Sequence, residues 1–387
     1  MILFFAQMFK TLVLESELTI SPNRTYFPNL HGLRFIAAAM VFVHHMEQAL
    51  DANGLSNAYT TYPALFLLGK LGVVLFFVLS GFLITYLLLE EESVGSINVK
   101  NFYFRRVLRI WPLYYLIVGL SLFVFPHFEF FTLNGWSYSA TDTTRLIQIL
   151  LYLFLFANLA LKVAGPLLHA SHTWSIGTEE QFYLIWPLLI KYIKRCRILL
   201  LISIIVGYMG LNYFFQQPAC GVVPYNVYIT KFLDVFNIDC MAIGGLVALL
   251  LYRKSFVLKF ILRIEVLVGS VILSLGMIYF NVRVPYFTYE LYAVPFVLII
   301  LNLSSNGSIT NLLENRFFHY LGNVSYGLYM YQPLMVFLSI KIFAGYLPDQ
   351  YSVITLYVLS GILTVAVSGI SYRYFETPFL KLKSRFI

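Results

Sequence analysis

An arginine and two histidines interrupt an otherwise apolar stretch near the start of the chain, "HGLRFIAAAMVFVHHM" (His31 to Met46). Such groups are costly in hydrocarbon, so inside a membrane span they face protein or a wet cavity and usually serve function. Arg34 and His45 are eleven residues apart, which on a helix leaves them about 20° out of alignment and roughly 16 Å apart along the axis. His44 lies about 80° away from Arg34. An imidazole is largely neutral at pH 7 and can act as a general base; the alternative is an interfacial histidine hydrogen-bonded to a neighbour.

Three arginines open the stretch "RRVLRIWP". Guanidinium groups match the oxygens of phosphate, and residues three or four positions apart share a helix face. The pattern therefore suits a phosphate-bearing ligand, although topology signals and lipid-headgroup anchoring would produce it too. The candidates are Arg105, Arg106 and Arg109.

Two adjacent carboxylates lie in "HTWSIGTEEQFYLIWP" (His172 to Pro187). Glu179 or Glu180 could orient a substrate hydroxyl, pair with an arginine or tune the histidine; the alternative is two solvated acids in an interfacial loop. Ser80, in another part of the chain, would act as a nucleophile only with a base beside it. Weaker candidates for substrate contact or packing are Ser80, Trp174 and Asp239. No residues show metal-ligand spacing, so no metal is expected.

The elements that carry these residues are predicted to be membrane helices. Of the 387 residues, 60% are hydrophobic and 11% charged, and the mean hydropathy is +0.79. A soluble domain is closer to half apolar and a quarter charged. We therefore expect an all-α, polytopic helical bundle in the lipid bilayer, whose net charge of +8 reflects basic cytoplasmic loops and not nucleic-acid binding. We expect a cytoplasmic segment over 1–27, one membrane domain over 28–383 and no appended soluble domain.

Apolar runs of spanning length occur near 30–50, 65–89, 109–126, 146–163, 178–193, 198–217, 233–252, 258–280, 286–303, 318–341 and 351–372. The basic clusters at 102–110 and 191–197 both belong in the cytoplasm, yet three of these runs lie between them. One of the three should therefore not cross, and 178–193 is the weakest. We expect about ten transmembrane helices, both termini in the cytoplasm, and a re-entrant segment near 170–193. The alternative is that the second basic cluster violates the positive-inside rule.

Five motifs in order resemble those of the type-3 membrane acyltransferases, over about residues 28–383. They are "HGLRFIAAAMVFVHH", "GVVLFFVLSGFLIT", "FYFRRVLRIWPLYY", "HTWSIGTEEQFYLIWP" and "SYRYFETPFLKLK". Members of that family are bacterial integral membrane enzymes that O-acylate surface polysaccharides. The resemblance therefore implies an O-acyltransferase domain in the bacterial cytoplasmic (inner) membrane. Three positions depart from the family pattern: His31, Asn237 and Gln332 stand where the family has Asp, Arg and His.

The resemblance also implies residue roles. His45 would be the catalytic histidine and Arg34 its partner. The arginines at 105–109 would engage a cytoplasmic acyl-CoA donor, taken as acetyl-CoA with succinyl-CoA left open, and Glu179 or Glu180 would be a functional acid. The acceptor would be a hydroxyl of an extracytoplasmic or lipid-linked polysaccharide or glycolipid. The histidine would either deprotonate that hydroxyl or carry the acyl group itself.

Two other classes of function compete with this interpretation. A transporter or flippase for a lipid-linked saccharide would also have about ten spans and buried polar groups, but such proteins more often show symmetry between halves, and no internal repeat is evident. A structural scaffold for polysaccharide assembly predicts that substitutions at His45 or Arg106 would be silent.

Overall fold

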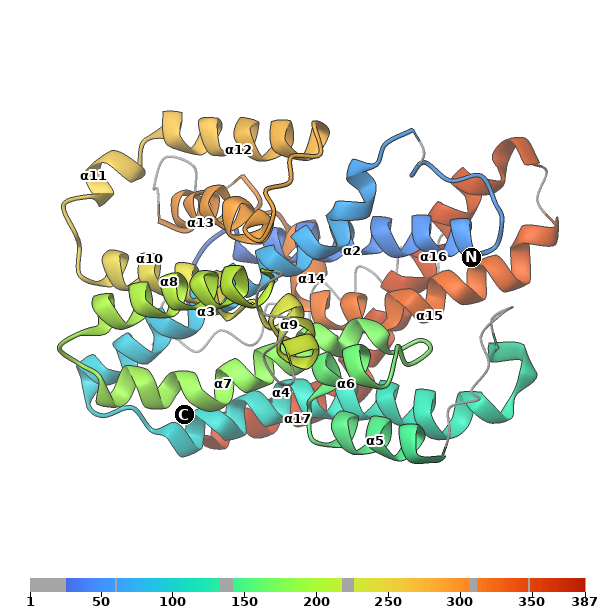
Figure 1. Cartoon of the computed structure of the whole chain (residues 1–387), viewed down its shortest axis with the longest axis horizontal. Coiled ribbons are helices and arrows are strands. Elements are labelled where there is room, and N and C mark those ends of the chain that lie inside the picture. The colour runs from blue at the N-terminus through green and yellow to red at the C-terminus, as the bar shows by residue number, and fades with distance from the viewer. Residues whose placement is uncertain are drawn as a thin grey trace. The chain divides into compact units, whose positions relative to one another are not determined.

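The computed structural model describes residues 26–59, 61–132, 142–217, 226–305, 312–346 and 349–386, and these form helices and turns with no strand among them (Figure 1). The α-helices are α2 (Leu30–Ala52), α3 (Ala64–Val94), α4 (Val99–Gly119), α5 (Asp142–Leu153), α6 (Ala157–Val163), α7 (Trp174–Tyr192), α8 (Arg197–Phe215), α9 (Asn226–Phe236), α10 (Ile238–Tyr252), α11 (Leu258–Ile261), α12 (Ile264–Tyr279), α13 (Thr288–Ser305), α14 (Arg316–Asn323), α15 (Ser325–Phe343), α16 (Asp349–Ser371) and α17 (Thr377–Leu382). Within this part of the chain, seven helical stretches are long and apolar enough to cross a membrane. The predicted all-α, polytopic membrane fold is confirmed. All but the last two residues of the predicted segment 1–27 lie outside the described residues.

The chain divides into two compact units. Unit 1 comprises Met1–Leu79, Lys254–Val282 and Val294–Pro378, and unit 2 comprises Ser80–Arg253, Arg283–Ala293 and Phe379–Ile387. Helices α3 and α13 each contribute to both units. The histidines of α2 belong to unit 1, whereas the arginines of α4 and the adjacent glutamates of α7 belong to unit 2.

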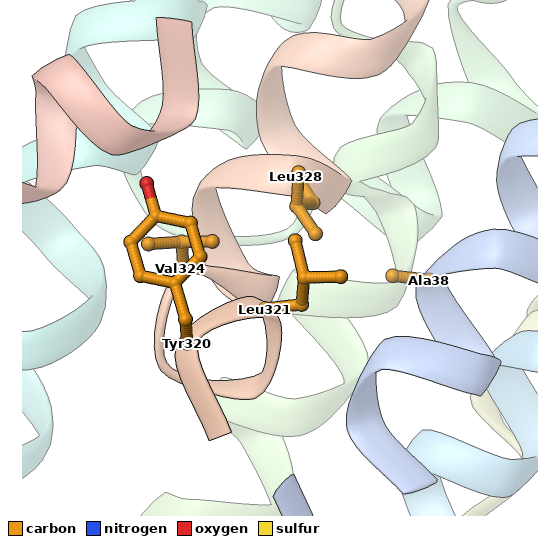
Figure 2. Close-up of a cluster of buried hydrophobic side chains, with 5 residues drawn as sticks. All are labelled: Ala38, Tyr320, Leu321, Val324 and Leu328. Carbon is orange, nitrogen blue, oxygen red and sulfur yellow. The ribbon is translucent and has the colours of Figure 1, made fainter. Parts of the chain in front are cut away.

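In unit 1, α2 packs against the helices of the C-terminal region through two apolar clusters. The first joins α2 to α14 and α15 and consists of Ala38, Tyr320, Leu321, Val324 and Leu328 (Figure 2). The second joins α2 to α15 and α16 and consists of Met46, Leu50, Val336, Ile340 and Leu356. Residue numbers rise together along α2 and α15 from the first cluster to the second, so the two helices run side by side in the same direction.

Another face of α2 lies directly on α3. A Cβ atom at Gly72 would lie 2.6 Å from the carbonyl oxygen of Ala37, and one at Gly69 would lie 2.4 Å from the His44 ring. Small residues let membrane helices approach closely, and the packing then stabilises them without a hydrophobic driving force. The glycines of "LLGKLG" thus fix where the first half of α3 meets α2.

The start of α2 is held by a buried asparagine. Asn29 has a φ of 64°, in the left-handed region that asparagine tolerates better than most residues. Its side chain donates to the carbonyl of Leu303 at 2.7 Å and accepts from the amide of Leu313 at 2.6 Å. Its own amide donates to Glu314 at 2.6 Å. These bonds fix the entry of α2 against the connection that precedes α14.

In unit 2, the two basic clusters meet at one end of α3. Arg105 of α4 pairs with Glu91 at 3.0 Å, while Arg197 and Lys194 pair with Glu92 at 2.6 and 2.9 Å. Both clusters therefore lie at the same end of unit 2, as the positive-inside argument requires.

The apolar run that is interrupted is not the one predicted, 170–193. The apolar run at 146–163 is split into α5 and α6 around Leu155, whose φ is 64°, and at 12 and 7 residues neither helix is long enough to cross alone. Residues 174–192, by contrast, form the uninterrupted helix α7, so the chain does not turn back there. The polar residues of α7 are accommodated because unit 2 supplies partners, such as the carbonyl of Val235 for the Thr178 hydroxyl at 2.9 Å. The expected re-entrant segment is thus a continuous helix, although it is not among the seven apolar candidates.

Candidate functional site

The first polar centre belongs to unit 1 and is called here the histidine centre: Arg34, His44 and His45 of α2. Because α2 is one unbroken helix, Arg34 and His45 share a face as predicted. Ala37, which touches α3, lies about 60° to one side of Arg34, and Ala38, which packs against α15, lies about 40° to the other. Arg34 and His45, both partly buried, therefore point toward the junction of α2, α3 and α15.

The neighbouring His44 is enclosed by packing. Its Nδ1 lies 3.1 Å from the Tyr59 hydroxyl, which also donates to the His44 carbonyl at 2.8 Å. The ring of Phe66 meets it edge-on at 5.4 Å, and Gly69 leaves no room for a Cβ atom beside it. These contacts give His44 a structural role and make His45 the candidate for chemistry.

A buried acid that we did not single out in the sequence supports this centre. Glu47 is 3% exposed, and its carboxylate accepts from the Tyr357 hydroxyl of α16 and from the Ala58 amide, each at 2.5 Å. It therefore ties the connection that carries Tyr59 to α2 and α16. Its position inside the predicted span 30–50 was the available signal, since intramembrane acids are rare.

The second polar centre belongs to unit 2 and is called here the carboxylate–arginine network. Glu179 accepts hydrogen bonds from the Ser80 hydroxyl and the Tyr183 hydroxyl, both at 2.9 Å. The Arg106 guanidinium lies 5.3 Å from the ring centres of both Phe102 and Tyr183, a favourable cation–π arrangement. The structure thus brings three predicted residues from three helices together around Tyr183, and Glu179 is a potential base beside Ser80.

The adjacent Glu180 is held on one side only. One of its oxygens accepts from the Trp111 indole at 2.9 Å, whereas Oε1 is buried with no hydrogen-bond partner among the described residues. The Arg106 Nε is likewise buried and has no hydrogen-bond partner among the described residues. Glu179 therefore has both oxygens occupied by protein, while Glu180 and Arg106 each keep a group that a ligand could satisfy.

Of the remaining predicted residues, Arg105 and Arg109 lie close enough to the network to interact electrostatically with Arg106, and Arg109 also with Glu179, whereas Trp174 and Asp239 lie elsewhere. Arg105 is engaged by Glu91 and by the carbonyl of Phe386 at 2.8 Å. Arg109 is partly buried one turn further along α4, and Trp174 begins α7. Asp239 is fully buried in the first turn of α10, beside the carboxyl group of Glu290. Among the described residues no group of three His, Cys, Asp or Glu side chains is arranged to hold a metal ion.

Apolar helices around a histidine centre and a carboxylate–arginine network define a polytopic membrane protein with groups capable of acid–base chemistry. The model of a family described as an acyltransferase domain matches residues 27–373. The chain therefore belongs to this family, the type-3 membrane acyltransferases.

The chain is similar to several curated proteins. It is 27% identical to a peptidoglycan O-acetyltransferase, OatA, of Listeria monocytogenes, over 93% of this chain and 56% of that protein. It is 28% identical to a putative O-acetyltransferase of Staphylococcus aureus, over 92% of the chain and 58% of the relative. An O-acetyltransferase OatA of S. aureus is 25% identical, over 92% and 57%. The chain thus spans a little over half the length of these relatives. No solved structure matches it.

Proposed function

We propose that this chain is a membrane O-acyltransferase that moves an acyl group, taken as acetyl, from cytoplasmic acyl-CoA to a hydroxyl of an extracytoplasmic or lipid-linked polysaccharide. Family membership supports the reaction class. The similar proteins named as O-acetyltransferases, one of them of peptidoglycan, support acetyl transfer and a glycan acceptor. The observation that carries the proposal is the histidine centre, in which His45 shares the inner face of α2 with Arg34 while His44 is enclosed.

In this proposal His45 is the reacting group. As a general base it takes the proton of the acceptor hydroxyl while that oxygen attacks the thioester carbon, a role worth about 10²–10⁴ in rate. Alternatively its nitrogen attacks the thioester and carries the acyl group to the acceptor. Arg34, in phase on the same helix face, provides a fixed positive charge near the other end of that face.

The carboxylate–arginine network serves the donor and the acid–base chemistry. Acyl-CoA carries phosphates, and we assign Arg105, Arg106 and Arg109 to them. Arg106 has the strongest case because aromatic rings hold its guanidinium and Nε lacks a protein partner among the described residues. Glu180 is the acid we assign to substrate contact, and Glu179 the one that positions Ser80 and Tyr183.

The proposed location is the bacterial cytoplasmic membrane, with both termini in the cytoplasm. The basic clusters that converge on Glu91 and Glu92 support it, because basic residues collect on the cytoplasmic side. The Phe386 carbonyl bonded to Arg105 puts the C-terminal segment at the same end of unit 2. That end is where acyl-CoA would arrive.

The proposal is tested by comparing the two histidines. Purified protein is incubated with acetyl-CoA and the host's isolated envelope polysaccharide, and thiol release and glycan acetylation are measured. His45→Gln should lower the rate about 10²–10⁴-fold, whereas His44→Gln should retain most of the rate and lower the thermal stability. Equal rates for His45→Gln and wild type would refute the role of His45. Wild-type protein that consumes no acetyl-CoA and leaves the glycan mass unchanged would favour the transporter.

A further inference from the structure

A buried amide on α15 leaves its donor group unpaired. Gln332 is 1% exposed, and its Nε2 meets no hydrogen-bond acceptor among the described residues. A buried donor left unpaired costs about 1–3 kcal/mol, so folded proteins contain few of them, and each calls for an explanation.

Helical register places this amide against α2. Leu328 belongs to the cluster that contains Ala38, and Val336 to the cluster that contains Met46. Gln332 lies four residues from each, on the same face of α15, within about 40° of both. Because α2 and α15 run side by side in the same direction, the amide faces the part of α2 between Ala38 and Met46.

The same amide is flanked by α3. Tyr329, about 60° from Gln332 around α15, meets the ring of Phe76 on α3 edge-on at 5.9 Å. Leu328 and Val336 lie about 40° to either side of Gln332, and Tyr329 lies just beyond Val336, so Gln332 is on the α2-facing side of α15, next to its α3-facing side. This is the junction of α2, α3 and α15 toward which Arg34 and His45 also point, and all of these residues belong to unit 1.

We propose that Gln332 is a catalytic residue whose Nε2–H stabilises the oxyanion formed during acyl transfer. The inference rests on the proposed function. The acceptor oxygen bonds to the thioester carbonyl carbon, its proton passes to His45, and the carbonyl oxygen takes the negative charge that the amide binds. The tetrahedral species then collapses: the C–S bond breaks, and the departing thiolate takes the proton from the imidazolium.

An amide left unpaired at rest is suited to this work. A hydrogen bond that forms only as charge develops lowers the barrier without stabilising the ground state. The same oxyanion forms if His45 carries the acyl group, so the assignment holds for either route. The cost of the unpaired donor is then explained as a requirement of the reaction.

The test replaces the amide by an apolar side chain of similar length. Gln332→Met is expected to lower kcat for acetyl-CoA consumption about 10²–10³-fold with little change in KM. Its thermal midpoint should equal or exceed that of wild type, because a buried unpaired donor is removed. Gln332→Leu serves as a second variant. A kcat within threefold of wild type in either folded variant overturns the assignment, and so does failure of both to fold, which would make the amide structural.

A matched control comes from another buried polar group of unit 1. Ser368 of α16 is fully buried, and its hydroxyl also has no partner among the described residues. Ser368→Ala should keep wild-type kcat, and an equal loss there would show that the effect reports packing in general. His45→Gln separates the two proposals. If it stays active, the proposed role of His45 fails, and if wild-type protein consumes no acetyl-CoA, the proposed function fails; an inactive His45→Gln beside an active Gln332→Met overturns only the assignment of the amide.

Discussion

Each unit contains an adjacent pair of identical residues, His44–His45 in unit 1 and Glu179–Glu180 in unit 2, and each unit treats the two members differently. His44 is enclosed by Tyr59, Phe66 and Gly69, and Glu179 has both oxygens hydrogen-bonded. Neighbours on a helix point about 100° apart, so each member meets different helices. One member of each pair is thus fixed by the fold, and the other is the better candidate for chemistry.

The units also differ in how their polar groups are supported. In unit 2 three predicted residues are linked through Tyr183: the Ser80 and Tyr183 hydroxyls donate to Glu179, and the Arg106 guanidinium lies over the Tyr183 ring. In unit 1 the short hydrogen bonds are accepted by Glu47, which was not predicted and lies two residues after His45. Substitution of Glu179, which accepts hydrogen bonds from two residues of the carboxylate–arginine network, should therefore cost stability, whereas in the histidine centre His44 should govern stability and His45 activity.

The largest effect that would sharpen this comparison is expected at the arginines. Arg106→Ala should raise KM for acetyl-CoA about 10- to 100-fold, because a charged hydrogen bond contributes about 1.5–3 kcal/mol. Arg105→Ala should change KM only a few-fold, since its guanidinium is already engaged by Glu91. Steady-state kinetics on both variants is the measurement, and the reverse order would move the donor site to Arg105.

The glutamate pair should split into a stability effect and an activity effect. Glu179→Gln removes an acceptor for the Ser80 or Tyr183 hydroxyl and should cost about 1–3 kcal/mol of stability. Glu180→Gln should leave the thermal midpoint near that of wild type and lower kcat. Thermal unfolding and acetyl-CoA turnover on the two variants decide the matter. Two equally stable, equally active variants would contradict the division of roles.

A smaller effect is expected at Glu47. In Glu47→Gln one of the two carboxylate oxygens becomes an NH2 group, which cannot accept a hydrogen bond from the Tyr357 hydroxyl or the Ala58 amide. The protein should therefore lose about 1–2 kcal/mol of stability. Hydrogen exchange at residues 55–59 should speed up, because the connection loses its tie to α2. Gln48→Ala, at an exposed position of the same helix, is the control and should leave exchange unchanged. If exchange is equally slow in both variants, Glu47 does not hold this connection.

A pH dependence is expected in unit 2. Burial lowers the pKa of His169, in the connection before α7, to about 4, from its ordinary value near 6.5. Its ring nitrogen donates to the Phe131 carbonyl at 3.1 Å. The unfolded chain therefore binds the proton more readily, and this part of the stability is lost as pH falls from about 6.5 toward 4. His169→Gln should flatten the decline of the thermal midpoint over that range, while His127→Gln, at an exposed position, should preserve it; identical slopes would argue against the buried imidazole.

Much of the fold and part of the site could be predicted from the sequence. Apolar composition required membrane helices, and helical periodicity aligned Arg34 with His45, because both follow from the chain itself. The interrupted segment was assigned to 178–193 because Glu179 and Glu180 weakened its apolar pattern. The structure gives those acids partners in unit 2, and α7 is continuous.

The amino-acid order by itself determined the membrane class, the helix faces and the set of candidate residues. Tertiary structure alone decided which histidine and which glutamate are fixed, that Glu47 is tied to Tyr357, and that the Gln332 amide is buried. The physical reason is the distance along the chain: Ser80 and Glu179 are 99 residues apart, and Glu47 and Tyr357 are 310 apart. Periodicity sets the direction of a side chain, whereas its partner comes from wherever the fold brings another helix.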